Sequence, residues 1–430
     1  MMIPHKHVVT IGKTVRRASR LRGGTGSALP GLVVEKLDPK FAARVLSELP
    51  QGVVIITGTN GKTTTTKIVC KLLSDHGYKV FTNRTGSNFI RGIIASILAE
   101  TNSEGMLDAD IAVLELDEAY AAQFVKQFRP RYSLLLNVMR DQLDRFGEID
   151  HTARLLRTVA LATVEAVILN RDDPLLCTIA NDLPSTVARR YFGISPQLKA
   201  NFPSDQDLYG TTKSTSVDTP PVTNNDVLLD KLTGHDAVFA FGSKKLPSTT
   251  LKIDGVYNAQ NAAAALALVR TILGDGADTD WLLGSLATAR PAFGRGEAIV
   301  IQGHPLEIVL VKNPAGFRLA LDSYADRPAA TMIAINDNYA DGRDMSWLWD
   351  VNFDAFARVD VVSGIRAYDM ALRLQYDDVE VGIVEPSLSK ALKQFLSGKP
   401  EPRRIFCTYT AMMTIRKILQ QSYNLEDIDA

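Results

Sequence analysis

Residues 53–64 read VVIITGTNGKTT, and this stretch decides the fold of the first domain. The apolar run Val53–Ile56 predicts a buried β-strand, and a helix is expected at Lys67–His76, after a turn that holds two glycines. Glycines between a strand and a helix let backbone N–H groups close around phosphate oxygens. The stretch therefore predicts a phosphate-binding loop at the edge of a parallel α/β sheet.

The loop supplies seven candidate nucleotide-binding residues: Gly58, Thr59, Asn60, Gly61, Lys62, Thr63 and Thr64. Its spacing, Gly-x-x-Gly-Lys-Thr-Thr, is two residues shorter than the common Walker A loop, but the physics is the same. The N-terminus of the following helix adds partial positive charge. We expect Lys62 to reach the β- and γ-phosphates of ATP and the Thr63 hydroxyl to bind Mg²⁺. A chance glycine turn would not be flanked by a matching strand and helix.

A carboxylate stands near the end of the next buried strand, residues 110–116 (DIAVLEL). Because ligands bind at the carboxyl ends of parallel strands, we predict that Glu115 is a second ligand of the Mg²⁺ ion and part of the catalytic site. Asp117 and Glu118 follow at once, and we interpret them as acids at the N-terminus of a helix.

Composition limits the class of protein. The chain has 430 residues, which predicts two or three domains, and a formal net charge of zero, which gives no reason to expect a nucleic-acid partner. No apolar run reaches the roughly 18 residues that a membrane helix needs. Three distant cysteines exclude a disulfide framework and fit a reducing cytoplasm. We interpret the basic N-terminus as a solvated arm, with contact to anionic lipid or to a partner as the alternative.

Strands and helices alternate through residues 46–294, which predicts a doubly wound, mainly parallel sheet in one domain. Residues 1–45 form an N-terminal segment that lacks a long periodic pattern, apart from a possible helix at Pro39–Leu49. Further strands are expected at Lys79–Thr82, Ser133–Val138 and Ala166–Asn170, and helices at Phe89–Ala99, Ala119–Phe128, His151–Thr163 and Asn258–Thr271.

Residues 200–252 are rich in Ser, Thr, Asp, Asn and Pro, and we interpret them as a surface insertion, with a hairpin that includes Ala237–Phe241. A second α/β domain is expected at 295–430. Its predicted strands are Ala298–Gln302, Glu307–Val311, Thr331–Ile335, Val359–Val362, Glu380–Ile383 and Arg404–Cys407.

The phosphate loop resembles that of the Mur ligases and folylpolyglutamate synthetases. Other segments resemble Mur ligase motifs in the same order along the chain: residues 136–145, 169–174, 254–261, 294–297 and 312–314. The resemblance spans roughly residues 50–320. It implies a Mur ligase-type central P-loop ATPase domain and a C-terminal Rossmann-like domain. It also implies that Asn170, Asn258 and Arg295 bind the nucleotide, Asn170 beside the adenine.

Departures from the Mur pattern narrow the choice. Gln142 replaces the metal-binding histidine and Val309 replaces an aspartate of the family. No lysine lies between Lys126 and Lys199, so the carbamylated lysine of the amino-acid-adding ligases has no counterpart. Only 57 residues precede Gly58, too few for a separate domain that grips a UDP-sugar. The chain is therefore not expected to extend a UDP-linked precursor.

Three C-terminal segments resemble the MurT family: residues 335–350 (INDNYADGRDMSWLWD), 364–374 (GIRAYDMALRL) and 408–412 (TYTAM). The resemblance implies an ATP-dependent carbon–nitrogen ligase subunit of the lipid II isoglutaminyl synthase type, paired with GatD, a class I glutamine amidotransferase that supplies ammonia. The pair would amidate the α-carboxyl of D-Glu in the stem peptide of membrane-anchored lipid II, via an acyl phosphate. The chain would then act in the cytoplasm, at the inner face of the cell membrane.

In this family an aspartate of the C-terminal domain completes the Cys–His pair of the glutaminase. We predict that Asp350 has this role, with Asp344 as the second candidate. The alternative is that the acids of residues 337–350 are turn formers and caps. Trp347 and Trp349 are expected to be exposed and to suit a protein–protein interface.

Many MurT chains carry a four-cysteine zinc ribbon in the region that matches residues 200–240. That stretch has no cysteine here, so no zinc is expected. Two other functions stay open: a folylpolyglutamate-type or amino-acid-adding ligase, and a non-catalytic scaffold gated by nucleotide. The changes at Gln142 and Val309 keep the scaffold possible, whereas intact Lys62, Thr63 and Glu115 favour an enzyme.

Overall fold

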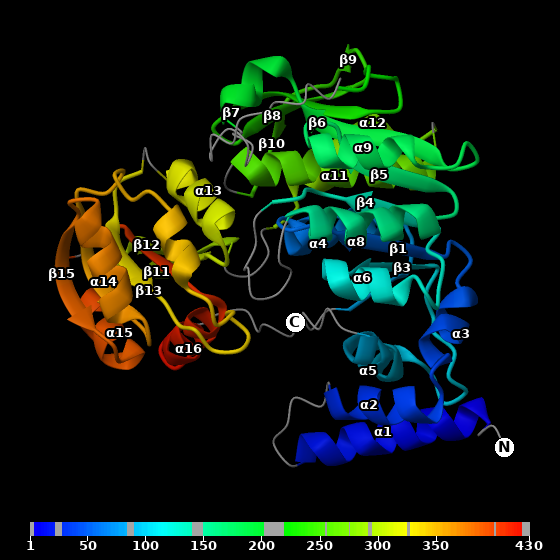
Figure 1. The fold of residues 1–430 in the computed structure, drawn as a ribbon, viewed down its shortest axis with the longest axis horizontal. Coiled ribbons are helices and arrows are strands. Elements are labelled where there is room, and N and C mark those ends of the chain that lie inside the picture. Colours follow the sequence, from blue (N-terminus) through cyan, green and yellow to red (C-terminus); the bar gives the residue numbers. More distant parts are fainter. Residues whose placement is uncertain are drawn as a thin grey trace. The chain divides into compact units, whose positions relative to one another are not determined.

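The computed structural model describes residues 4–21, 28–83, 90–139, 149–201, 219–253, 256–274, 276–290, 295–324, 327–399 and 401–423. The chain divides into two compact units (Figure 1). Unit 1 comprises Met1–Val138, Asp150–Lys252 and Asn258–Ala289, and unit 2 comprises Met139–Ile149, Ile253–Tyr257 and Arg290–Ala430. Each unit contains a mainly parallel sheet, so the predicted α/β class is confirmed.

Unit 1 is built on a ten-stranded sheet in the order β10-β8-β7-β6-β5-β4-β1-β3-β2, with β9 paired to β8. Strands β1 to β7 pair with one another in parallel, and the β7–β8, β8–β9 and β8–β10 pairs are antiparallel. The bounds are β1 Val53–Thr57, β2 Val80–Thr82, β3 Ile111–Glu115, β4 Tyr132–Leu135, β5 Ala166–Asn170, β6 Ala188–Ile194, β7 Val227–Thr233, β8 Asp236–Phe241, β9 Lys244–Lys245 and β10 Thr249–Thr250. Strands β1, β3, β4 and β5 are buried throughout, as central parallel strands must be.

Helices of unit 1 pack against this sheet and against one another. They are α3 Phe41–Ser47, α4 Lys62–Asp75, α5 Ile90–Glu100, α6 Glu118–Phe124, α8 Ile149–Ala162, α9 Pro174–Asn181, η1 Pro196–Asn201, α11 Val256–Leu273 and α12 Thr279–Ala287. Helix α4 begins at Lys62, five residues before the predicted Lys67. The phosphate loop therefore leads straight into the helix, with no intervening segment.

The N-terminal residues form helices, so the interpretation as a solvated arm is wrong. Helix α1 (His5–Leu21) packs on α2 (Ala28–Leu37), and α2 packs on α5, at the blue end of the chain in Figure 1. Val8 and Val34 are fully buried. Gly31 allows the close approach of α2 to α5, because a Cβ there would lie 2.0 Å from the Arg91 carbonyl oxygen. In α1 the many basic side chains made the few apolar positions that pack hard to recognise in the sequence.

The expected hairpin in residues 200–252 is present as β7 and β8, but it belongs to the main sheet. Strand β7 pairs in parallel with β6, with Phe192 opposite Val227, and β6 was not predicted at all. Val227 and Leu229 are fully buried. The described part of this region is thus an extension of the sheet and not a surface insertion, while residues 202–218 lie outside the described residues.

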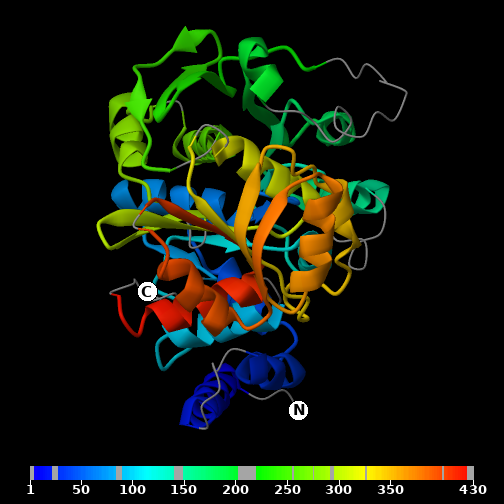
Figure 2. The ribbon, with the colours of Figure 1, turned by 90° about the vertical axis from the view of Figure 1, so that its left-hand side faces the viewer.

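Unit 2 (yellow to red in Figure 2) has a six-stranded sheet in the order β11-β12-β16-β13-β14-β15. Only the β11–β12 pair among these is antiparallel. The strands are β11 Arg295–Ile301, β12 His304–Leu310, β13 Ala330–Ala334, β14 Arg358–Ser363, β15 Glu380–Glu385 and β16 Arg403–Cys407. The helices are α13 Pro314–Tyr324, η2 Ser346–Asp350, α14 Ala367–Tyr376, α15 Leu388–Leu396 and α16 Tyr409–Leu419.

Two apolar cores lie on the two faces of this second sheet. Phe406 packs in the core formed with α13, η2 and α14, and its neighbour Ile405 packs in the core formed with α15 and α16. Adjacent residues of a strand point to opposite faces, so the sheet is covered on both sides. Among the residues that the structure describes, no helix combines the length and the apolar character needed to cross a membrane.

Candidate functional site

The phosphate loop lies at the carboxyl end of β1, between β4 and β3. Sheet order reverses there, since β2 and β3 lie on one side of β1 and β4 on the other, and such a switch point is where open α/β sheets bind ligands. Gly58 and Gly61 have φ angles of 134° and 89°, which favour glycine. A Cβ on Gly61 would also lie 2.4 Å from Oδ1 of Asn261. Both glycines are therefore needed for the shape of the loop.

Asn137, which follows β4, clamps the loop. Its Oδ1 accepts from the backbone N–H of Asn60 at 2.8 Å, and its Nδ2 donates to the Asn60 carbonyl at 3.0 Å. The N–H of Thr59 donates to the Asn137 carbonyl at 3.1 Å. The sequence put Asn137 in a Mur-like motif but gave it no role. An asparagine directly after a strand that neighbours β1 is the signal that could have identified it.

Asp173 connects two of the Mur-like motifs. Its Oδ2 accepts from the N–H of Val138 at 2.7 Å, while its Oδ1 accepts from Leu175 and Leu176 and so caps α9. The segment that carries Asn137 is thereby fixed to the segment that begins with Asn170. These motifs form one supporting frame around the loop.

Lys62 is buried, with 6% of its surface exposed. Its Nζ donates to the carbonyl oxygens of Gly58 at 2.5 Å and Thr59 at 3.2 Å. It also lies 3.5 Å from Oε2 of Glu118. The interpretation of Glu118 as a helix N-terminal acid is therefore incomplete: it begins α6, but its buried side chain turns to the loop lysine.

Thr63 and Glu115, the two predicted Mg²⁺ ligands, are in direct contact. Oγ1 of Thr63 donates to Oε1 of Glu115 at 2.9 Å. Asn83, which the sequence reasoning missed, fixes the backbone of Glu115 on both sides, because it accepts from the N–H at 2.9 Å and donates to the carbonyl at 2.8 Å. A hydroxyl and a carboxylate are the hard oxygen ligands that Mg²⁺ prefers, so these residues fit that ion.

Asp117 adds a second carboxylate at this end of β3. It is 8% exposed, and its Oδ1 has no hydrogen-bond partner among the described residues. It occupies the N-cap position of α6 but makes no capping hydrogen bond. The negative charges of Glu115 and Asp117 thus lie two residues apart at the carboxyl end of one strand.

The other predicted binding residues come from several elements. Thr64 is buried in the first turn of α4. Asn170 ends β5 and accepts from the N–H of Asp172 at 3.0 Å. Asn258 lies in α11 and accepts from Nδ2 of Asn261 at 3.3 Å. Arg295 begins β11, but its side chain, like all of Gln142, lies outside the described residues.

Three of the four aspartates between residues 337 and 350 have structural roles. Asp337 pairs with Arg366 at 2.7 Å. Asp341 accepts from the N–H of Thr410 at 2.7 Å, and burial raises its pKa. Asp344 accepts from the N–H of Ser346 at 2.9 Å, and hydrogen bonds from Ser346 lower its pKa. The alternative of turn formers and caps fits Asp341 and Asp344, whereas Asp337 forms an ion pair.

Asp350 differs. Arg318 donates to its backbone carbonyl, and Arg373 donates to the carbonyl oxygens of Leu348 at 3.2 Å and Val351 at 2.5 Å. Within the described part of the chain, however, the structure gives no hydrogen bond or ion pair to the Asp350 carboxylate. The backbone is held by two arginines, while the half-buried acid keeps its hydrogen-bonding capacity.

The two tryptophans of this segment have different environments. Trp347 is 4% exposed and packs against Phe317, so its predicted exposure is wrong. Trp349 is 50% exposed and packs edge-on against Tyr376, itself 69% exposed. Tyr368 and Leu372 continue an exposed apolar row along α14 at helical spacing. One of the two tryptophans predicted to be exposed is therefore exposed, and exposed side chains of α14 lie on the same surface as Tyr376.

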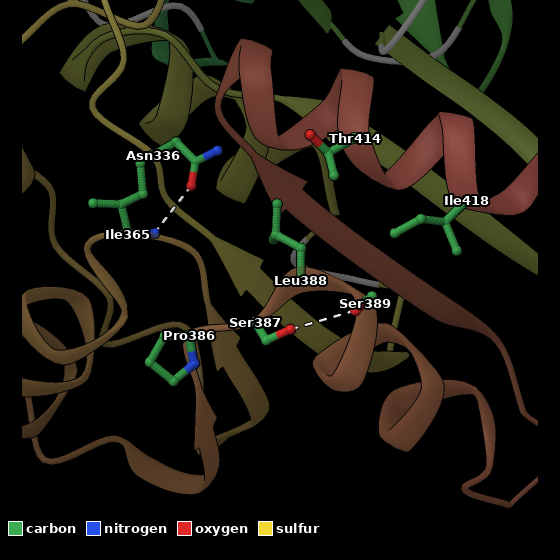
Figure 3. Close-up of a pocket in the computed structure, with 8 residues that line it drawn as sticks. All are labelled: Asn336, Ile365, Pro386, Ser387, Leu388, Ser389, Thr414 and Ile418. Atoms are coloured by element: carbon green, nitrogen blue, oxygen red, sulfur yellow. Dashed lines mark hydrogen bonds between the residues drawn. The ribbon is translucent and has the colours of Figure 1, made fainter.

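Unit 2 also contains a hollow of about 520 Å³ near the carboxyl ends of β13, β14 and β15. Figure 3 shows its lining: Asn336, Ile365, Pro386, Ser387, Leu388, Ser389, Thr414 and Ile418. None of the predicted site residues lines it. Across the described ranges, no group of three or more His, Cys, Asp or Glu side chains is arranged to hold a metal, and the absence of zinc stays a prediction.

Comparison with known proteins extends these observations to the whole chain. The Mur ligase middle domain family matches residues 56–269 and the MurT ligase C-terminal family matches residues 310–412. A Streptococcus pneumoniae (strain ATCC BAA-255 / R6) protein named "Lipid II isoglutaminyl synthase (glutamine-hydrolyzing) subunit MurT" is 31% identical, over 95% of this chain and 96% of its own length. The protein of the same name from Staphylococcus aureus (strain COL) is 28% identical, over 96% and 98%.

Solved structures show the same fold at lower identity. MurF from Acinetobacter baumannii superposes with a TM-score of 0.67 at 18% identity, covering 91% of this chain and 81% of the other. MurF from Thermotoga maritima, solved in complex with ADP, gives 0.64 at 19%, covering 91% and 83%. The resemblance predicted from the sequence is thus confirmed: the chain belongs to the MurT family of Mur ligase-type enzymes.

Proposed function

We propose that this protein is the amidating subunit of a lipid II isoglutaminyl synthase, which uses ATP to convert the α-carboxyl of D-Glu in the stem peptide to the amide of D-isoglutamine. One observation carries the proposal: a MurT-family chain brings Lys62, Thr63 and Glu115 together at its phosphate loop. The relatives' name, a glutamine-hydrolysing synthase subunit, supports the same reaction.

The chemistry explains why ATP is needed. A carboxylate does not react with ammonia at neutral pH, because its carbonyl carbon is a poor electrophile. One oxygen of the carboxylate attacks the γ-phosphorus, the bond to the β-phosphate oxygen breaks, and ADP leaves. Ammonia then attacks the carbonyl carbon of the acyl phosphate, phosphate leaves, and the nitrogen loses a proton. The protein contributes positioning and charge stabilisation.

The loop residues divide this work. Lys62 supplies positive charge at the transferred phosphate, and backbone N–H groups of the loop hold the nucleotide. Thr63 and Glu115 would hold Mg²⁺, which neutralises phosphate charge when bound. Asn83 and Asn137 keep Glu115 and the loop in place. Asn170, Asn258 and Arg295 remain proposed nucleotide contacts.

A second polypeptide would supply the ammonia, because none of the three cysteines has the surroundings of a glutaminase nucleophile. Cys70 lies within helix α4 and not at a turn between a strand and a helix. Burial raises the pKa of Cys177 to about 11, and Cys407 is fully buried, so neither is a reactive thiolate. We infer that the partner is a GatD-type glutamine amidotransferase. Direct transfer of ammonia between the subunits avoids protonation to ammonium, which is not a nucleophile.

The turn that carries Asp350 suits contact with such a partner. A Cys–His pair works better when a carboxylate orients the imidazole and stabilises its cation. Among the four aspartates, Asp350 is the one whose carboxylate is not engaged within the described residues, and exposed Trp349 lies beside it. Exposed aromatic residues are common at the centres of protein interfaces. We therefore assign Asp350, ahead of Asp344, to the glutaminase site.

The location follows from the substrate. Lipid II is anchored in the membrane, whereas ATP and glutamine are cytoplasmic, so the enzyme would act at the inner face of the cell membrane. The structure offers no spanning helix in its described residues, and the anchored substrate would bring the protein to the bilayer.

The test is to purify the tagged chain with its co-expressed glutaminase and to measure ADP release. We expect ADP release only when lipid II and glutamine are both present. An ammonium salt should be able to take the place of glutamine. Turnover with an amino acid in place of glutamine would instead favour an amino-acid-adding or folylpolyglutamate-type ligase. Nucleotide binding without turnover under any condition would favour a scaffold gated by nucleotide.

A further inference from the structure

A buried ion pair joins the loop lysine to helix α6. Nζ of Lys62 and Oε2 of Glu118 are 3.5 Å apart, and the exposed fractions of the two side chains are 8% and 1%. The same ammonium donates to two loop carbonyls. The proposed function uses Lys62 for phosphate binding and leaves Glu118 without a role.

The position of Glu118 at a helix N-terminus does not explain its burial. An acid in the first turn of a helix is stabilised by the helix dipole while it remains in water. A buried carboxylate, in contrast, needs a partner of opposite charge, because its desolvation is costly. Within the residues that the structure describes, Glu118 forms its ion pair with Lys62. The two side chains come from elements 56 residues apart, so the pairing is a product of the tertiary fold.

Glu118 and a nucleotide phosphate make the same demand on Lys62. An ammonium has three N–H donors, and two of its directions here are towards the Gly58 and Thr59 carbonyls. The carboxylate of Glu118 therefore gives the Lys62 ammonium the negative charge that a phosphate oxygen would give it. Two anions beside one cation also repel each other, more strongly in a buried site than in water.

We propose that Glu118 is a positioning residue that stands in for the phosphate. It holds the Lys62 ammonium against the loop in the nucleotide-free protein and competes with the nucleotide for it. The proposal rests on the proposed function, in which Lys62 binds phosphate. The proposal predicts opposite effects on binding and on catalysis. Without the charge of Glu118, the nucleotide binds more tightly, but Lys62 is less well oriented for the transition state.

Glu118→Gln tests this, because it keeps the shape of the side chain and removes the charge. We expect the Kd for MgADP, measured by calorimetry on the purified chain, to fall about fivefold, as expected when one repelling charge is removed from the site. We expect kcat for amidation by the complete enzyme to fall about tenfold, because tighter ground-state binding gives no gain in the transition state. Glu118→Asp retains the charge and should keep the MgADP affinity near that of the wild type.

Glu307→Gln is the matched control. It removes the charge of Glu307, which pairs with Arg404 at 2.6 Å in unit 2 and is 15% exposed, and should lower the melting temperature without changing MgADP affinity. A folded Glu118→Gln protein with unchanged or weaker MgADP binding would overturn the proposal, as would a lowered melting temperature with no other change. If Lys62→Ala binds MgADP like the wild type, the proposed phosphate site itself is wrong, which is a different failure.

Discussion

The phosphate loop of unit 1 and the acidic turn of unit 2 offer two clusters of polar residues with opposite organisation. In the loop, Lys62 donates to the Gly58 carbonyl and Thr63 donates to Glu115. Asn137, which follows β4, accepts from the backbone of Asn60. In the turn, Asp337, Asp341 and Asp344 are each bonded within unit 2. Asp350 alone among the four keeps a carboxylate that the described residues do not engage.

The difference teaches how a site can be complete or incomplete within one chain. The loop has its lysine, its proposed metal ligands and its supporting asparagines in unit 1, so their proposed roles can be tested on this protein alone. The turn has backbone carbonyls bonded by two arginines and an acid that the described residues do not engage, so its proposed role needs a partner. The predictions below test this contrast, from the largest expected effect to the smallest.

Asp350→Asn should have the largest effect, on the partner's reaction. Loss of a triad acid costs up to about 10⁴ in rate in serine proteases, and cysteine enzymes often lose less. We expect glutamate release from glutamine by the reconstituted pair to fall steeply, while MgADP binding and complex formation stay intact. Asp369→Asn, an exposed acid of α14 paired with Arg366, is the control. Full glutaminase activity in Asp350→Asn with loss in Asp344→Asn would move the role to Asp344.

Lys62→Ala should abolish amidation by the complete enzyme, with a loss of about 100-fold or more, the range seen when one electrostatic stabiliser is removed. Glutaminase activity should survive, because the acidic turn lies in unit 2. Lys71→Ala is the control on the same helix, since that lysine makes an exposed pair with Asp75. Near-normal amidation by Lys62→Ala would remove the loop from the mechanism.

Asn137→Ala should weaken MgADP binding about tenfold. The change removes both side-chain hydrogen bonds to the Asn60 backbone and leaves those groups unsatisfied, at a cost of about 1–3 kcal/mol. Calorimetric titration with MgADP measures it. Asn102→Ala removes two comparable bonds to backbone N–H groups in an exposed turn and should leave the affinity unchanged. Equal affinity in both variants would mean that the loop holds its shape without Asn137.

Removal of zinc should have no effect, which is the smallest change expected. Residues 200–240 offer His235 and no cysteine, whereas a tetrahedral structural site needs four nitrogen or sulfur ligands. A zinc chelator should leave the melting temperature unchanged, and elemental analysis should find no stoichiometric zinc. About one zinc per chain would contradict the prediction.

Several features were readable from the sequence because they depend on neighbours along the chain. The strand at Val53–Ile56, the glycine spacing and the lysine that follows are local, and backbone sterics alone make Gly58 and Gly61 the residues that such a loop needs. The alternation of strands and helices likewise predicted the α/β class. Helix α1 was missed because its basic residues outnumber the apolar positions that pack, and α2 because Pro30 and Gly31 are typical of helix breaks.

Only the tertiary structure decided which polar groups are engaged. Asn60 and Asn137 are 77 residues apart, Lys62 and Glu118 are 56 apart, and no periodicity in the sequence relates such pairs. Asp344 and Asp350 look alike as acids in one turn, yet one is bonded to Ser346 and the other is not engaged within the described residues. Residue type fixes what a side chain can do. Whether it is buried, paired or available is fixed by the elements that the fold brings against it, because desolvation and hydrogen bonding depend on neighbours in space.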